Sequence, residues 1–197
     1  MIKPRPTAHT ELHMPRRAPR VRVSALPLAL PSQFRRRRSA RHGLGVFAVK
    51  PIAAGTRIIE YAGELISHAE GERRYPTAPD GHEEAEHTYL LQLDDDRVID
   101  ANVGGNDARY INHSCAPNCE PMPAGDHMWI VSVRRIRPGE ELSYDYAIEL
   151  DEPHTSARKQ RFPCRCGARQ CRGTLLKAKR APFHPLVRAA RRRLDPS

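Results

Sequence analysis

The chain has 197 residues, which is enough for one folded domain with terminal extensions. Hydrophobic residues make up 39% of it, and no apolar run reaches the length of a membrane span, so no membrane association is expected. The net charge of +10 is uneven: residues 42–155 hold 9 basic residues against 21 acids, residues 1–41 hold 11 against one, and residues 156–197 hold 13 against one. An acidic centre between two cationic ends would attract cationic peptides, unless its acids form only a solvated face.

Residues 1–38 are expected to form a disordered basic tail, because six prolines fall within the first 33 residues. No signal peptide is apparent, and the stretch lacks the amphipathic pattern of a transit peptide. The tail ends in four consecutive arginines at residues 35–38. A nucleic-acid patch, a nuclear import signal and a solvated linker all remain open for this run.

Short strands separated by glycine turns are predicted along the centre of the chain. Residues 44–49 and 57–61 have strand composition, with turn residues between them. The spacing Val-basic-x-Ile-x-x-Gly-x-x-aliphatic begins at Val49 and recurs at Val133. We infer short sheets that reuse one strand–turn–strand unit.

A short helix is predicted from the capping box Ser67-x-x-Glu70 to about residue 74. Residues 77–86 are expected to be an exposed acidic loop. Residues 89–93 and 97–100 flank three aspartates and predict a hairpin. A calcium loop would need further ligands and a turn glycine, so an acidic turn is favoured. Residues 128–133 predict another buried strand.

The central stretch of residues 105–119, GNDARYINHSCAPNC, is polar and cysteine-bearing, although it lies between strand-like segments. Burying such residues requires hydrogen-bond partners or a ligand. A merely structural loop is the alternative.

This stretch resembles the signature of SET-domain protein lysine methyltransferases, and four other segments resemble further motifs of that family in the same order: residues 42–48 (HGLGVFA), 60–64 (EYAGE), 139–146 (GEELSYDY) and 164–171 (CRCGARQC). The match covers about residues 39–174. It implies a SET domain at 39–150, a post-SET zinc segment at 160–176 and a basic tail at 177–197. The implied fold is mainly β, with short β-clip-like sheets, a pseudoknot and few short helices.

The resemblance also implies a site for S-adenosylmethionine. By themselves Gly43 and Gly45 could mark only a tight turn, and the dinucleotide fingerprint is not met because a third glycine and a following helix are missing. The residues that the resemblance places at the cofactor are His42, Gly43, Leu44, Gly45, Tyr89, Arg109, Asn112, His113 and Phe162.

Tyr146 is the catalytic residue that the resemblance implies. Free lysine has a pKa of about 10.4, so the amine must lose its proton before it attacks a methyl group. A tyrosine hydroxyl can orient that amine. Tyr144 lies on the same side of a strand as Tyr146, and in the family a tyrosine at this position favours a monomethyl product. Tyr61 would line the same lysine channel.

Cys164, Cys166 and Cys171 offer three thiolates, one short of a tetrahedral zinc site. The resemblance supplies Cys115 as the fourth ligand, while Cys119 or His113 are competing assignments. A disulfide is the remaining alternative, although Cys-x-Cys is an awkward bridge and no secretion signal is seen.

We therefore expect a protein-lysine N-methyltransferase that uses S-adenosylmethionine and Zn²⁺, with a histone, histone-like or ribosomal protein as the basic substrate. The basic tails suggest a nucleic-acid contact. A catalytically weak SET-like binding module and a zinc-containing nucleic-acid-binding protein are the alternatives. The compartment stays open, being cytoplasmic for a bacterial protein and nuclear for a eukaryotic or secreted effector protein.

Overall fold

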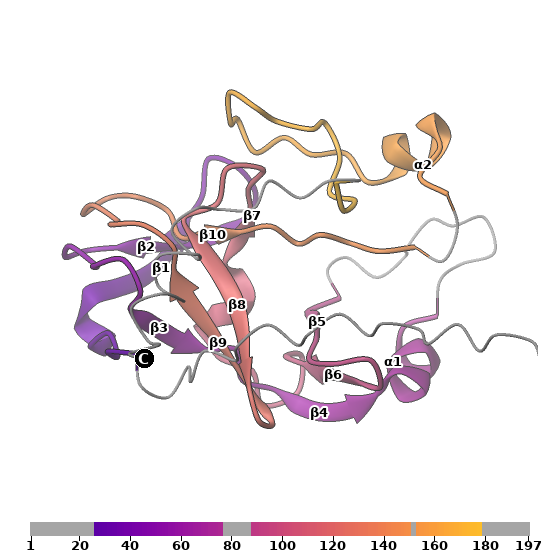
Figure 1. Cartoon of the computed structure of the whole chain (residues 1–197), viewed down its shortest axis with the longest axis horizontal. Coiled ribbons are helices and arrows are strands. Elements are labelled where there is room, and N and C mark those ends of the chain that lie inside the picture. Colours follow the sequence, from indigo (N-terminus) through magenta and orange to yellow (C-terminus); the bar gives the residue numbers. More distant parts are fainter. Residues whose placement is uncertain (1–25, 77–87, 151–152, 179–197) are drawn as a thin grey trace, which may run out of the picture.

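The computed structural model describes residues 26–76, 88–150 and 153–178, and it is built mainly from short strands (Figure 1). The described strands are β1 (Phe34–Arg38), β2 (Leu44–Ala48), β3 (Arg57–Glu60), β4 (Glu64–Ser67), β5 (Leu90–Gln92), β6 (Arg97–Asp100), β7 (Asn112–His113), β8 (Cys119–Ala124), β9 (His127–Ser132) and β10 (Ser143–Tyr144). The described helices are α1 (His68–Arg74), α2 (Ser156–Arg161) and the 3-10 helices η2 (Pro31–Gln33) and η3 (Asp107–Tyr110). The predicted mainly β fold with few short helices is confirmed, while the predicted acidic loop lies outside the described residues.

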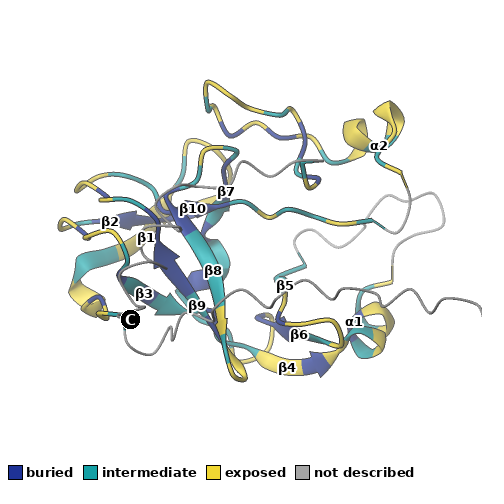
Figure 2. Cartoon of the chain, in the orientation of Figure 1, coloured by how far each residue is buried: buried dark blue, intermediate teal, exposed yellow. Residues whose placement is uncertain are grey.

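Two three-stranded sheets form the body of the domain. One has the order β3-β9-β8 and the other β4-β6-β5, and all four pairings are antiparallel. The predicted hairpin of β5 and β6 is present, and its turn is closed by the Asp94 carboxylate, which accepts hydrogen bonds from the backbone N–H groups of Asp96 and Arg97. Figure 2 shows that β9 is buried along most of its length, and Ile130 in its middle is fully buried.

The repeated strand–turn–strand unit pairs with itself. Ile52 and Ile136, at matching positions of the two copies, exchange backbone hydrogen bonds of 3.0 and 2.9 Å. The turn glycines Gly55 and Gly139 both have positive φ, at 77° and 86°. The sequence repeat is therefore also a structural repeat.

Strand β1 lies within the stretch that we expected to be disordered, so that prediction is wrong for residues 26–38. β1 pairs antiparallel with β2 along its whole length. The Arg37 guanidinium stacks 3.9 Å above the Phe47 ring and donates a hydrogen bond to the Gly139 carbonyl. Arginine stems can cover apolar surface while the charge stays in water, which a count of charges does not reveal. Before β1, the backbone of Ala29 donates to the Arg57 carbonyl and extends the β3 edge.

Strands β7 and β10 pair in parallel and bring together two segments about thirty residues apart. Asn118 fixes this crossing, because its side chain accepts from the Ser143 N–H at 2.8 Å and donates to the Glu141 carbonyl at 2.8 Å. Residues 153–178 form a separate arm with little regular structure, drawn in orange and yellow along one side of the sheets (Figure 1). In the described residues, no helix has the length and apolar character needed to cross a membrane.

Candidate active site

A cavity of about 700 Å³ lies between residues 41–44 at the start of β2, which we call the glycine loop, the central stretch and the C-terminal arm. Its lining residues are Arg41, His42, Gly43, Leu44, Tyr89, Arg109, Tyr110, Asn112, His113, Tyr146, Pro163, Cys164, Arg165, Cys166 and Leu175. The structure thus brings together most of the residues expected at the cofactor. Gly45 and Phe162 do not line the cavity, and neither do Tyr61 and Tyr144.

The side-chain amide of Asn112 holds the glycine loop through hydrogen bonds. The Asn112 Nδ2 group donates to the Leu44 carbonyl at 2.9 Å and to Glu141 Oε1 at 2.7 Å. A Cβ at Gly45 would lie 2.3 Å from the same Glu141 oxygen, so a larger residue here would displace that carboxylate. Gly43 has a positive φ of 46°, a conformation that glycine adopts without strain. These contacts place the Asn112 side chain under the loop.

Two of the predicted catalytic tyrosines, Tyr144 and Tyr146, pack against each other. The Tyr146 ring lies 5.0 Å from the Tyr144 ring, and the Tyr146 hydroxyl donates to the Ile111 carbonyl at 3.1 Å. The Tyr61 hydroxyl donates to the Tyr89 carbonyl, also at 3.1 Å. Burial, reinforced by the neighbouring hydroxyls, raises the pKa of Tyr61 and Tyr144 well above the ordinary value. Partial burial raises the pKa of Tyr146 as well. All three side chains are therefore neutral hydroxyls at physiological pH.

Tyr146 differs from the expectation in one respect. Strand β10 ends at Tyr144, so Tyr146 lies just beyond it and before Ala147, which has a positive φ of 47°. Tyr144 is buried, whereas Tyr146 is 36% exposed and borders the cavity. Tyr146 is thus the tyrosine of this pair that a bound molecule can reach.

His113 is buried, and both of its ring nitrogens have partners. Nδ1 lies 3.1 Å from the backbone nitrogen of Tyr146, and Nε2 lies 3.3 Å from Cys115 Sγ. Burial lowers the pKa of His113 to about 4, so the ring is neutral near pH 7. Its nitrogens are therefore engaged within the protein, although the residue borders the cavity.

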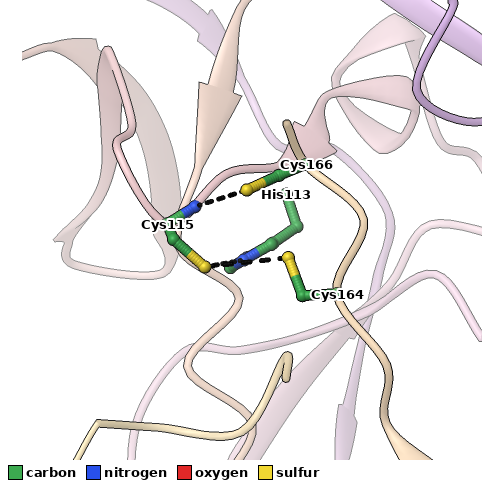
Figure 3. A group of neighbouring side chains, drawn as sticks. All are labelled: His113, Cys115, Cys164 and Cys166. Atoms are coloured by element: carbon green, nitrogen blue, oxygen red, sulfur yellow. Dashed lines mark hydrogen bonds between the residues drawn. The ribbon is translucent and has the colours of Figure 1, made fainter. Parts of the chain in front are cut away.

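A cluster of sulfur atoms lies beside His113 (Figure 3). The ligand atoms of His113, Cys115, Cys164 and Cys166 all lie within 4.8 Å of one another. Cys171 belongs to the same neighbourhood, because its Sγ lies 4.0 Å from Cys115 Sγ. The four cysteines Cys115, Cys164, Cys166 and Cys171, which come from the central stretch and the C-terminal arm, form what we call the sulfur cluster.

Two distances within the sulfur cluster fit a tetrahedral metal site. Sulfur ligands at about 2.3 Å from a tetrahedral zinc ion lie about 3.8 Å apart. Cys115 Sγ is 3.7 Å from Cys164 Sγ and 4.0 Å from Cys171 Sγ. Burial opposes ionisation of Cys166, but N–H donors from Cys115 and Ala168 outweigh it and lower its pKa to about 6. A thiolate is the form that binds a metal. Burial raises the pKa of Cys115 and Cys164, so Cys166 is the thiol of these three that ionises most readily.

Cys119 lies apart from the sulfur cluster. It is buried at the start of β8, where its thiol contacts Asn118 Oδ1 at 3.4 Å. Burial raises the pKa of this thiol to about 12, so it stays protonated. Of the two cysteines considered as the fourth ligand, the geometry thus brings only Cys115 to the other three.

Two residues of the site, Arg172 and Tyr110, were not predicted from the sequence. Arg172 joins the arm to the segment that carries Tyr146, because its guanidinium donates to both carboxylate oxygens of Asp145 at 2.6 and 2.8 Å. The predicted Arg109 donates to the Tyr110 hydroxyl at 2.6 Å and stacks on the Tyr110 and Tyr89 rings. Tyr110 lies inside the central stretch and Arg172 directly follows the cysteine motif of residues 164–171, but no sequence signal showed what their side chains contact.

The sequence comparisons agree with this geometry. Residues 43–147, more than half of the chain, match the SET domain family. The chain therefore belongs to the SET domain family.

Its relatives include proteins that are named histone-lysine N-methyltransferases. Histone-lysine N-methyltransferase trithorax of Drosophila virilis is 40% identical over 142 residues, which are 68% of this chain and 3% of that protein. Histone-lysine N-methyltransferase 2D of Homo sapiens is 39% identical over 139 residues, 68% of this chain and 2% of that protein. Histone-lysine N-methyltransferase ash1 of Drosophila melanogaster is 39% identical over 141 residues, 70% of this chain and 6% of that protein. The chain thus spans a small part of each relative.

Proposed function

We propose that the chain is a protein-lysine N-methyltransferase that uses S-adenosylmethionine. The observation that carries this proposal is the position of Tyr146, which borders the cavity beside the Asn112-pinned glycine loop. Membership of the SET domain family and the names of the relatives support it. When bound in the cavity, S-adenosylmethionine would supply an electrophilic methyl group on its sulfonium.

The tyrosine hydroxyls are suited to orient a lysine amine. The hydroxyl protons of Tyr146 and Tyr61 are directed to the carbonyls of Ile111 and Tyr89. The oxygen of Tyr146, which borders the cavity, then keeps lone pairs that can accept N–H bonds from the amine. Because their pKa values are raised, these hydroxyls act as positioning acceptors and not as bases at neutral pH. Their contribution is to align the amine lone pair and to exclude water.

We propose a monomethylated lysine as the main product. Tyr144 is buried and its ring lies beside Tyr146, so its hydroxyl occupies space next to the expected amine position. Replacing Tyr144 with Phe would remove that oxygen and leave room for further methyl groups. The Tyr144→Phe variant should therefore give more dimethyl product than the wild type.

A basic protein segment, with a histone tail as the first candidate, is the proposed substrate. Residues 42–155 carry 21 acids against 9 basic residues, which favours the approach of a cationic peptide. The relatives named histone-lysine N-methyltransferases support this choice. Zinc is the metal proposed for the sulfur cluster, where Cys115, Cys164, Cys166 and Cys171 would hold it and fix the C-terminal arm.

The decisive experiment incubates the protein with S-adenosylmethionine and core histones, histone-like proteins and ribosomal proteins, and counts added methyl groups by intact mass. We expect methylation of a basic protein that disappears in the Tyr146→Phe variant. Cofactor binding measured by calorimetry separates the alternatives. Failure to bind cofactor would refute the enzyme and favour a SET-like binding module.

A nucleic-acid contact through the basic N-terminal stretch is also proposed. Arg35 and Arg38 are exposed on β1, and Arg135 and Arg137 are exposed on the turn to which Arg37 is hydrogen-bonded. Guanidinium groups on adjoining segments suit phosphate contacts. In the Arg35→Gln/Arg38→Gln variant, the slope of log affinity for duplex DNA against log salt should fall by about 2. An unchanged slope would assign DNA binding, if any, to other residues.

A further inference from the structure

We infer that His113 is a positioning residue that couples the sulfur cluster to Tyr146, and that it is not a metal ligand. One ring nitrogen holds the backbone of Tyr146 and the other contacts Cys115 Sγ. The inference rests on the proposed metal site and concerns how that site acts on the catalytic tyrosine.

The hydrogen-bond pattern fixes the tautomer of the ring. A backbone N–H can only donate, so Nδ1 accepts from the Tyr146 N–H at 3.1 Å, while Asp145 Oδ1, which also faces Nδ1, lies farther away at 3.5 Å. A neutral imidazole carries one proton, which must then be on Nε2. That proton points toward Cys115 Sγ, 3.3 Å away. A protonated Nε2 has no lone pair for a metal ion, although its distances alone place it within the cluster.

This assignment leaves four thiols as the metal ligands. Cys115 Sγ then receives two N–H donors, from His113 Nε2 and from the backbone of Arg172 at 3.4 Å. Donors of this kind stabilise a thiolate and hold it in the orientation that a metal requires. Binding of a metal by Cys115 would therefore also fix the orientation of the His113 ring.

The second ring nitrogen of His113, Nδ1, holds the backbone of the catalytic tyrosine. Tyr146 follows the end of β10, so no strand pairing holds its N–H, and the acceptor is His113. The two rings also pack edge to face, with centroids 5.4 Å apart. A shift of the His113 ring would move Tyr146 relative to the cavity. A displacement of about 1 Å at a reacting group can reduce the rate about 100-fold.

Two amide variants separate the two contacts. The amide oxygen of His113→Asn can replace Nδ1 as the acceptor, whereas the amide nitrogen of His113→Gln can replace Nε2 as the donor. We expect His113→Asn to bind zinc about 10–100-fold more weakly in chelator competition, and to lose less kcat at saturating zinc than His113→Gln does. We expect His113→Gln to retain zinc affinity and to lose about 100-fold in kcat, with the KM for cofactor unchanged.

Cobalt substitution tests the ligand set without any methyl transfer. The Co²⁺-loaded wild type should give the absorption spectrum of a tetrathiolate site, and both variants should give the same spectrum. A spectrum that changes in either variant would make His113 a ligand and overturn the inference. Equal losses of zinc affinity and of kcat in both variants would overturn it as well, because they indicate only a structural role.

A measurement on the unaltered protein removes any dependence on whether the variants fold. In the zinc-loaded wild type labelled with ¹⁵N-histidine, the long-range ¹H–¹⁵N spectrum should show His113 protonated on Nε2. Protonation on Nδ1, or a metal-bound Nε2, would contradict the inference. A wild type that binds neither Zn²⁺ nor Co²⁺ would also overturn it, while methylation by that same preparation would show that the proposed function survives.

Discussion

The β-sheet body and the C-terminal arm of this protein are stabilised in different ways. In the body, β9 pairs along its length with β8 and also with β3, and its centre is fully buried. The arm of residues 153–178 has one short helix, α2, of which none of the residues is buried. Figure 2 shows this contrast between the dark β9 and the exposed α2.

The arm is held by sulfur contacts, by the Arg172–Asp145 pair and by a short pairing of Leu176 with Ile148. Cys164 and Cys166 are buried against Cys115, and Leu176 is the fully buried apolar residue that the arm contributes. Yet the arm forms one wall of the cavity through Pro163, Arg165 and Leu175. The cavity is therefore lined partly by the stable β-sheet body and partly by the arm, whose position depends on the sulfur cluster.

Removing one thiol of the sulfur cluster should have the largest effect and should separate the two regions. In Cys164→Ser, we expect the arm to lose amide protection over residues 163–176, while β8 and β9 keep theirs. Methyl transfer should fall about 100-fold, because a wall of the cavity is displaced. Hydrogen exchange, metal content and single-turnover rates measure these changes.

Cys119→Ala is the matched control for that experiment, because Cys119 is a free thiol outside the sulfur cluster. It should retain the metal and the protection of the arm. Loss of protection in β9 equal to that in the arm would contradict the separation of the two regions.

Truncating the centre of the body should have the next largest effect. Ile130 is fully buried on the middle strand of the β3-β9-β8 sheet, so Ile130→Ala should lower the free energy of unfolding by about 2–5 kcal/mol. Chemical denaturation followed by tryptophan fluorescence measures this change. Leu28→Ala is the control, because Leu28 is 55% exposed and its loss should cost less than about 0.5 kcal/mol. Similar losses in both variants would show that the apolar centre of β9 does not dominate stability.

The sequence predicted the body better than the arm, and this follows from the same contrast. Strand periodicity and glycine turns are local signals, so β2, β3, β6, β9 and the paired turns were found. β1 was missed because four arginines suggest a solvated run, whereas Arg37 stacks on Phe47 and the strand is fixed by β2. That packing depends on residues that are remote in the sequence.

The site was predicted to the level of which residues meet, but not how they contact one another. Asn112, His113 and Tyr146 do border one cavity. The engagement of both His113 nitrogens within the protein could not be foreseen, because it depends on where the Tyr146 backbone lies after β10 ends. The Arg172–Asp145 pair was likewise hidden, since 27 residues separate its partners.

Breaking that pair should have an intermediate effect, because it joins the arm to the catalytic segment. Arg172→Met removes two charge-assisted bonds to Asp145 between partly buried side chains, and hydrogen bonds to charged groups contribute about 1.5–3 kcal/mol. We expect faster exchange in the arm and a reduced kcat. Double-mutant cycles with Asp145→Asn measure the coupling, and additive effects would show that the pair does not link the regions.

The smallest effect is expected at an ion pair on the surface of the body. His127 on β9 contacts Glu60 on β3 at 2.6 Å, and this carboxylate raises the pKa of His127 above its ordinary value. The pair therefore contributes stability below the unfolded pKa of about 6.5, and the contribution is lost as the pH rises through the folded pKa. An NMR titration should show the raised pKa in the wild type and a return toward the ordinary value in Glu60→Gln.

The unfolding midpoint should hardly change in Glu60→Gln, because the His127 side chain is 62% exposed and water screens the pair. Asp126→Asn is the control for the titration, since Asp126 raises the pKa of His127 only as the least of its causes. A large drop in stability between pH 6 and 8 that disappears in Glu60→Gln would mean that charge pairs, and not the buried strand, hold β3 to β9. The body would then depend on polar contacts as the arm does.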